Sequence, residues 1–237
     1  MLTMKYRVLL LLLLLNATSY SQQLSYSDAA QAYNRILLEK GNGTYQRVST
    51  YRVRGTQYLF GEKHQANMFA KGETAYNIKI SYNTFNQEVE FYSTSNPNKA
   101  LIKDAKEVDS FVIKPNANLG LTENLVFVNG QGLGASNNAF YQKVYAGEKF
   151  SLYKKYKSEL GIVTTSYIDA DLRQFDLSYE YFYFNHATKE LKKIKPNNST
   201  VKKEFKQVPN IETILENNSL TANPEVALKL IFTSLND

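Results

Sequence analysis

The sequence has no cysteine, no tryptophan, two histidines and five prolines in 237 residues. Without cysteine the chain has no disulfide, no thiolate metal ligand and no cysteine nucleophile. A domain without disulfides must be held together by its hydrophobic core, and a chain of this length is long enough to bury one. The absence of disulfides fits a bacterial envelope protein better than a small secreted animal module.

Long hydrophobic runs are also scarce, and residues 8–15, near the N-terminus, form the one that stands out. A membrane-spanning helix needs ~20 apolar residues, so this run is too short for an anchor. Lys5 and Arg7 precede it, and small polar residues follow it, which is the order of a cleavable secretory signal peptide. We predict a signal peptide at residues 1–21, cleaved near Ser21. Export would place the mature protein in the periplasm, at the outer membrane or outside the cell.

The excess of positive charge is small. The formal net charge is +6 at pH 7, and Lys5 and Arg7 of the predicted signal peptide account for two of these charges. The remaining +4 aids solubility and does not indicate a nucleic-acid-binding surface. No segment after the signal peptide is apolar enough to span a bilayer, so we expect a mature chain without a transmembrane segment.

What the sequence has in abundance is apolar–polar alternation of period two, which predicts strands. The clearest case is a hairpin of strands 75–82 and 87–93, in which Tyr76, Ile78, Ile80 and Tyr82 share one face. Short polar turns separate the segments, which favours an antiparallel meander. The other predicted strands are 68–70, 100–102, 111–113, 125–128, 140–145, 150–156, 179–184 and 190–194.

Helical periodicity is found near both ends of the mature chain. Residues 27–38 predict an N-terminal helix, and short helices follow around Val201 and at 211–215. A last helix is predicted with Asn223 as its cap and Pro224 at its first position. We therefore predict a mainly β (α+β) fold: an antiparallel meander forming a curved sheet or open barrel, with an N-terminal helix and a helical C-terminal tail. The single domain would span residues 22–237. Residues 22–195 would form the helix and sheet, and residues 196–237 the tail packed on them.

Two carboxylate pairs are the first candidates for catalysis. Glu88 and Glu90, and likewise Asp169 and Asp171, are two residues apart and would share one face of a strand. Glycosidase carboxylates instead face each other across a cleft, ~5 to 10 Å apart, from different elements. We interpret both pairs as solvent-facing.

Histidines and glycines give no stronger motif. His64 and His186 lack the spacing of a metal site. Residues 130–135 fit the glycine pattern of a dinucleotide-binding loop, but no strand–helix–strand unit surrounds them. We interpret this segment as a flexible glycine loop, which leaves open a role as a lid over a binding site. The sequence predicts no catalytic residue, no metal site and no cofactor.

The aromatic residues are the most suggestive feature, with 18 tyrosines and 13 phenylalanines. Tyr179, Tyr181 and Tyr183 share one face of a predicted strand, and Tyr153 and Tyr156 on the neighbouring hairpin extend the set. One interpretation is cross-strand packing in a half-buried sheet. The other is an aromatic platform for a glycan, peptide or lipid, which makes these five tyrosines the candidate ligand-binding residues.

Several segments of the chain form a recognisable set: a Tyr-Leu pair and a later glycine, a Tyr-Asn hairpin, a Leu-Tyr-Lys-Lys strand and a tyrosine-rich strand followed by a helical tail. They are residues 55–59, Gly72, residues 77–91, Lys143, Val144, Gly147, residues 152–155 and residues 179–194. In these features the chain resembles a family of secreted Bacteroidetes-type proteins of unknown function. The resemblance implies export. It implies no activity and no site residues.

We expect an exported, non-enzymatic envelope protein that binds a ligand or partner. The expected partners are an envelope protein, a glycan or a lipid, and not a nucleic acid. Two alternatives remain open: a structural or assembly component of the cell envelope, and a carboxylate-based envelope hydrolase.

Overall fold

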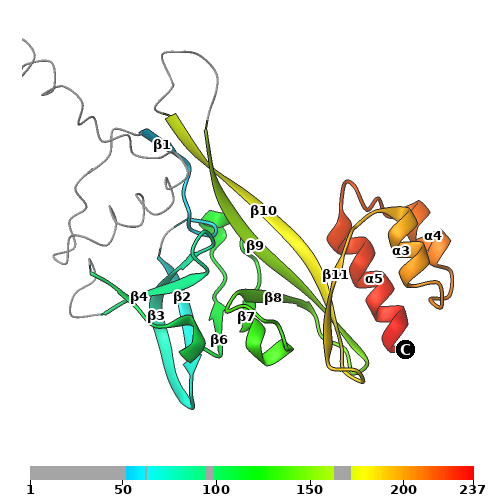
Figure 1. Ribbon diagram of the computed structural model, residues 1–237, viewed down its shortest axis with the longest axis horizontal. Helices are drawn as coiled ribbons and strands as arrows, with labels where there is room; N and C mark the ends of the chain where they lie inside the picture. The colour runs from blue at the N-terminus through cyan, green and yellow to red at the C-terminus, as the bar shows by residue number, and fades with distance from the viewer. Residues whose placement is uncertain (1–51, 62, 94–98, 163–171) are drawn as a thin grey trace, which may run out of the picture. The chain divides into compact units, whose positions relative to one another are not determined.

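Eleven strands in the described part of the chain form one large, mostly antiparallel sheet that does not close on itself, and three α-helices follow it (Figure 1). The computed structural model describes residues 52–61, 63–93, 99–162 and 172–237. The strands are β1 (Arg52–Arg54), β2 (His64–Ala70), β3 (Glu73–Asn83), β4 (Glu88–Tyr92), β5 (Ala100–Ile102), β6 (Ser110–Ile113), β7 (Leu125–Asn129), β8 (Phe140–Tyr145), β9 (Phe150–Ile162), β10 (Leu172–Asn185) and β11 (Glu190–Ile194). The helices are α3 (Asn198–Glu204), α4 (Ile211–Asn217) and α5 (Pro224–Asn236).

The sheet consists of two meanders joined side by side. Strands β2 to β5 pair in sequence order, as do β6 to β11, and the two sets join where β6 pairs with β2. The mainly β, antiparallel prediction is therefore confirmed, but the chain crosses back between β5 and β6. Strand β1 was not predicted; it pairs in parallel with the start of β10. The predicted N-terminal helix at residues 27–38 lies outside the described residues.

Strand β3 departs from the predicted alternation near its start. Its register with β2 shifts at a bulge, where Asn77 has a left-handed φ of 55°. An extra residue in one strand moves the following side chains to the opposite face. Tyr76, which we predicted on the same face as Ile80 and Tyr82, is therefore 67% exposed, whereas those two side chains are fully buried.

The first hydrophobic core is built largely from aromatic rings. Phe111 and Phe127 stack with ring centroids 4.7 Å apart. The Tyr82 ring meets both of them edge-on. The Phe140 ring meets Tyr82 and Phe111 edge-on. Such pairs stabilise by ~0.5–1.5 kcal/mol beyond the area they bury. These four rings come from β3, β6, β7 and β8, so the cluster holds the two meanders together.

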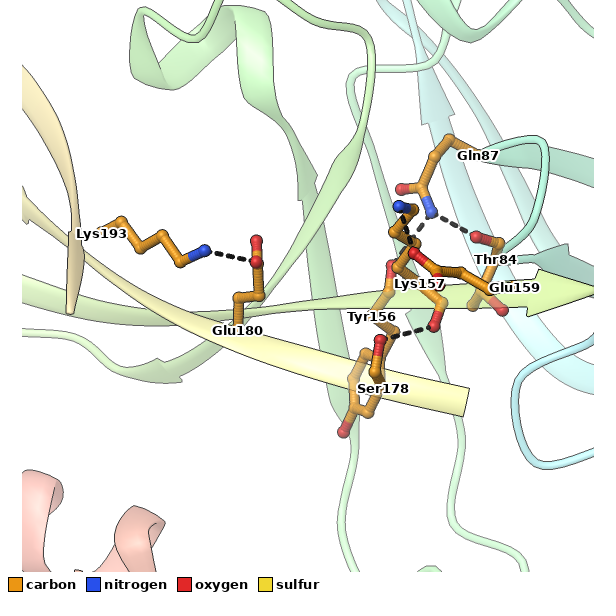
Figure 2. A network of polar contacts seen from close by, with 8 residues as sticks. All are labelled: Thr84, Gln87, Tyr156, Lys157, Glu159, Ser178, Glu180 and Lys193. Atoms are coloured by element: carbon orange, nitrogen blue, oxygen red, sulfur yellow. Dashed lines mark hydrogen bonds and ion pairs between the residues drawn. The ribbon is translucent and has the colours of Figure 1, made fainter. Parts of the chain in front are cut away.

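The tip of the β3–β4 hairpin is tied to β9 by a buried polar contact (Figure 2). The Gln87 amide nitrogen donates to the carbonyl oxygens of Thr84 at 2.7 Å and Tyr156 at 2.9 Å. The hydroxyls of Thr84 and Ser158 lie 2.6 Å apart. These bonds satisfy polar groups that would otherwise be costly to bury. They also join strands that are not neighbours in the sheet.

The second core lies between the three helices and one face of the sheet. Helix α5 packs on β8 and β9, and α4 packs on α5. Asn223 is the N-cap of α5 and Pro224 its first residue, as predicted, although the Asn223 side chain makes no capping hydrogen bond. Helices this short are unstable alone and depend on such packing. No helix in the described residues is long and apolar enough to span a bilayer.

Strands β9 and β10 are much longer than predicted. They pair continuously from Phe150 opposite Asn185 to Ile162 opposite Arg173. The extra residues, 157–162 and 172–178, include charged and polar side chains that mask the apolar alternation. Figure 1 shows the two strands side by side, with the helices beside the end at which β11 pairs.

Replacing Phe232 by alanine tests the docking of α5. This side chain is fully buried, with its ring centroid 5.3 Å from that of Phe205. We expect F232A to lower the free energy of unfolding by about 3–5 kcal/mol, as for other buried aromatics. The matched control V226A, at a 51% exposed position of the same helix, should change it by less than ~0.5 kcal/mol. Urea unfolding monitored by circular dichroism measures both. Equal effects would contradict the docking.

Candidate functional site

Among the described residues, one edge of β10 is unpaired over five residues. Strand β9 pairs with one edge of β10 over residues 173–185. On the other edge, β1 pairs with residues 172–174 and β11 with residues 181–185. Gly55 lies against the backbone of Phe175 and covers the next position. In the described part of the chain no strand pairs with this edge at residues 176–180, a length of ~17 Å at ~3.3 Å per residue.

The side chains along this gap alternate in character. Leu177 and Tyr179 share one face and are 47% and 48% exposed. Asp176, Ser178 and Glu180 lie on the other face. An exposed sheet edge with apolar side chains is a template for pairing with another chain, and natural proteins usually block it with lysine, proline or a bulge. None of these interrupts residues 176–180.

Beside the gap, three tyrosine rings surround the ammonium group of Lys154. Its Nζ atom lies 4.2 Å from the ring centroid of Tyr179, 5.1 Å from that of Tyr156 and 5.7 Å from that of Tyr181. The pairing of β9 with β10 creates this arrangement, because Lys154 lies opposite Tyr181 and Tyr156 opposite Tyr179. Cation–π contacts of this kind are worth ~0.5–2 kcal/mol, more when desolvated.

Helix α5 supplies the counter-charge. The Oε2 atom of Glu225 lies 3.2 Å from Lys154 Nζ, and these side chains are 32% and 14% exposed. Burial opposes ionisation of both groups, but Lys154 and Lys229 hold the pKa of Glu225 below its usual range. For Lys154, burial is outweighed by Tyr156 and Glu225, which raise its pKa. The pair therefore fixes the first turn of α5 against β9 and β10.

The five predicted tyrosines do not form one surface. Tyr156, Tyr179 and Tyr181 meet around Lys154, and only Tyr179 of the five is exposed. Tyr183 is buried beneath the helices, where its hydroxyl donates to Glu204 Oε1 at 2.5 Å. Tyr153 is buried on the opposite face of the sheet. A role of these residues in ligand binding stays a prediction, and on this geometry Tyr179 is the one that an external molecule can reach.

Tyr153 lines a cavity of about 290 Å³ next to the glycine segment. That segment is a 3₁₀ turn, Gly130–Leu133, ended by Gly134 in the left-handed conformation at φ 73°. A Cβ atom on Gly130 would lie 2.7 Å from the ring of Tyr141. This glycine is therefore required by close packing, which accounts for it without a bound dinucleotide.

Glu90 is buried, so the prediction that both members of its pair face solvent was wrong. The Tyr58 hydroxyl lies 2.9 and 3.0 Å from its two carboxylate oxygens, and the Tyr92 hydroxyl lies 3.4 Å from Oε2. Burial raises the pKa of Glu90, and the hydrogen bonds from the tyrosines partly offset that shift. Asp169 and Asp171 lie outside the described residues.

The histidines serve the fold. The buried Nε2 of His64 lies 2.8 Å from the Leu59 carbonyl oxygen and 3.1 Å from that of Gly61, so this nitrogen carries the proton and donates. His186 Nε2 lies 2.9 Å from the Ser151 hydroxyl. Across the described residues, no group of three or more histidine, aspartate and glutamate side chains is placed to hold a metal ion.

Comparison with known proteins gives no match: no protein-family model, no curated protein and no solved structure is similar to the chain. The resemblance to secreted Bacteroidetes-type proteins therefore stays a prediction. The function has to be inferred from the geometry of the β10 edge and its surroundings.

Sequence reasoning missed Lys154, Glu225 and Leu177. A signal for the first was present, because Lys154 occupies the same face as Leu152 and Tyr156 in the predicted strand 150–156. A lysine on an apolar face needs a partner. The identity of that partner, 71 residues later, carries no local signal.

A double-mutant cycle measures the coupling between Lys154 and Glu225. We expect K154M and E225Q each to lower the free energy of unfolding by about 1–2 kcal/mol, because each leaves a partly buried group without its main partner. The double variant should be less unstable than the sum, with a coupling of ~0.5–2 kcal/mol. The coupling should fall as acid protonates Glu225, at a pH below the usual range for glutamate, because its pKa in the folded state is lowered.

The pair Lys192–Glu190 is the matched control. Its side chains are more than half exposed, at 3.0 Å separation, so solvent screening should leave no measurable coupling in the same cycle. An equal coupling in both cycles would show that the tyrosines and helix α5 add nothing to the Lys154 pair.

Proposed function

We propose that the protein is an exported, non-enzymatic envelope protein that binds a partner protein by accepting an extended segment of it along the open edge of β10. The observation that carries the proposal is the five-residue gap between β1 and β11, with Leu177 and Tyr179 exposed beside it. Strand addition of this kind draws affinity from main-chain hydrogen bonds and specificity from alternate side chains. The predicted signal peptide supports export.

The gap selects a short segment over a second copy of the chain. Strand β10 is 14 residues long. Paired with its own copy at residues 176–180, it would continue past both ends of the gap and collide with β1 and β11. A flexible segment that is extended over about five residues and leaves the sheet at both ends meets no such obstacle.

The side chains beside the gap define the chemistry of that segment. Residues facing Leu177 and Tyr179 should be apolar or aromatic. Residues on the other face meet Asp176 and Glu180; a lysine, Lys193, already pairs with Glu180, which shows that this face accommodates basic side chains. We expect apolar residues alternating with basic or hydroxyl-bearing ones.

The geometry is compatible with one of the two alternative functions, the assembly component, and gives no support to the other, the carboxylate hydrolase. A structural or assembly component would use the same edge and differ only in its partner, so it is compatible with this proposal. A carboxylate hydrolase would need two carboxylates facing a cleft, whereas Glu90 is enclosed by Tyr58 and Tyr92. Its buried carboxylate gives that alternative no support.

Selection of displayed random ten-residue peptides against the folded protein tests the proposal. Selected peptides should show a period-two apolar pattern, and their affinity should fall at least ~10-fold for L177K, which costs ~1.4 kcal/mol. Lysine at this position blocks an edge as natural edge lysines do. The matched control is L230K, the same change at an exposed leucine of α5, which should leave affinity within about twofold.

N-methylation of single peptide residues then distinguishes strand addition from side-chain docking. Alternate positions should lose binding, because only every second N–H group faces β10. Peptides that bind L177K as tightly as the unmodified protein, or tolerate N-methylation throughout, would contradict the proposal.

A further inference from the structure

A polar pocket of about 500 Å³ lies on the other face of β9 from the Lys154 cluster. Lys154 and Lys155 are consecutive in the strand, so they point to opposite faces, and Lys155 lines the pocket. The other lining residues come from the β3–β4 turn and the start of β4, from the end of β5 and the segment after it, and from the segment before β8. They include Asn86, Glu88, Asp104, Asn137 and Asn138. Its volume lies within the range of ~300–1,000 Å³ typical of small-molecule sites.

Asn137 and Asn138 in the pocket wall each have side-chain N–H groups without a hydrogen-bond acceptor among the described residues. The Oδ1 atom of Asn137 accepts from the Ala139 N–H and the Tyr141 hydroxyl, each at 3.4 Å. The Oδ1 atom of Asn138 accepts from the Gln131 amide at 2.6 Å. These contacts fix the oxygens, which leaves each Nδ2 group with two N–H donors. Neither Nδ2 makes a hydrogen bond within the described residues.

Lys155 is the third uncommitted donor. It is partly buried, and no carboxylate of the described residues lies within 4.0 Å of its ammonium group. Its Nζ atom lies 5.8 Å from the ring centroid of Tyr141, and Glu180 lies opposite Lys155 in the pairing of β9 with β10. Burial lowers its pKa, Lys157 and Lys193 add to that effect, and Glu180 partly offsets it. An anion entering the pocket would add a direct ion pair, which Glu180 does not make with Lys155.

The two carboxylates in the wall restrict which anion fits. Asp104 accepts from the Lys106 N–H at 3.0 Å and Glu88 from the Asn86 amide at 3.3 Å, and each keeps lone pairs for further donors. They would repel a dianionic phosphate or sulfate group. A ligand with one carboxylate and several hydroxyls matches both sets, because its hydroxyls donate to these acids while its carboxylate accepts from Lys155.

We propose that this pocket binds a carboxylated saccharide, such as a uronic acid residue of a glycan, with its carboxylate on Lys155 and its hydroxyls on the amides and acids of the wall. The site is independent of strand addition at β10, because no residue of β10 lines the pocket. Either proposal stands or falls without the other.

A panel of carboxylated glycans and their neutral counterparts, applied to the full-length protein, tests the site. At least one carboxylated glycan should bind at least ~10-fold more tightly than its neutral counterpart, and K155M should remove that preference. The matched control is K157M, which removes the same charge two residues along β9 from a side chain that is outside the pocket lining and paired with Glu159 (Figure 2). It should change affinity by less than about twofold.

A second variant and a pH series keep the test decisive if K155M is poorly folded, as judged by circular dichroism. N138D replaces a donor by an acid of the same size and should weaken the carboxylated glycan selectively. Affinity should also fall with rising pH at a lower pH than an ordinary lysine would produce, because the pKa of Lys155 is lowered. Four results would each overturn the proposal: no binding of any carboxylated glycan, equal binding of the neutral one, unchanged affinity in folded K155M, or binding of inorganic phosphate alone.

Discussion

Continuous backbone pairing between β9 and β10 is the constraint on which the other features depend. One face of this pair receives the three helices, and the opposite face carries Tyr153 and Lys155 beside the two cavities. The β3–β4 hairpin is tied to β9 by Gln87. The open edge exists because β10 extends beyond both β1 and β11, the strands that cover its ends. A register change between β9 and β10 would thus disturb every site discussed above.

In the Lys154 cluster, formed by Lys154, Tyr156, Tyr179 and Tyr181, a lysine of the protein itself binds the tyrosine-rich face of the sheet. A sheet face bearing three tyrosines attracts cations, and here the chain supplies its own from the neighbouring strand. Glu225 then neutralises that charge and fixes the start of α5. The consequence for recognition is that Tyr156 and Tyr181 are committed to the protein's own lysine, and Tyr179 is left to face outward.

Local pattern predicted much of the sheet. Strands β5, β8 and β11 have the predicted bounds, because alternation within each segment is strong and short polar turns delimit it. What the pattern does not carry is pairing over long distances. Strand β1 has three residues and a parallel partner far along the chain, and the pairing of β2 with β6 bypasses three intervening strands. The same reason explains the wrong prediction for Glu90. The local pattern predicts a solvent-facing carboxylate, but Tyr58, 32 residues earlier, covers it in the fold.

For the candidate sites, the sequence predicts which residue types are present and which face of a strand each side chain occupies. It does not predict what surrounds those side chains. It placed Tyr179, Tyr181 and Tyr183 on one face correctly, since a strand alternates. Which of them α5 and its neighbours would cover depended on how three short helices dock. The uncommitted donors of Asn137, Asn138 and Lys155 are visible only once the partners of every neighbouring polar atom are known.

The pairing of β1 with β10 also sets an order of events during synthesis. Residue 52 pairs with residue 172, 120 positions later, whereas β3 and β4 pair with the strands next to them in the chain. Because the chain is synthesised from its N-terminus, β1 stays without this partner until β10 has been synthesised. Contacts of such sequence separation form slowly. The pairing of β1 with β10, which closes one end of the open edge, is therefore among the last parts of the sheet to form. A chain that ended before residue 172 would lack this pairing.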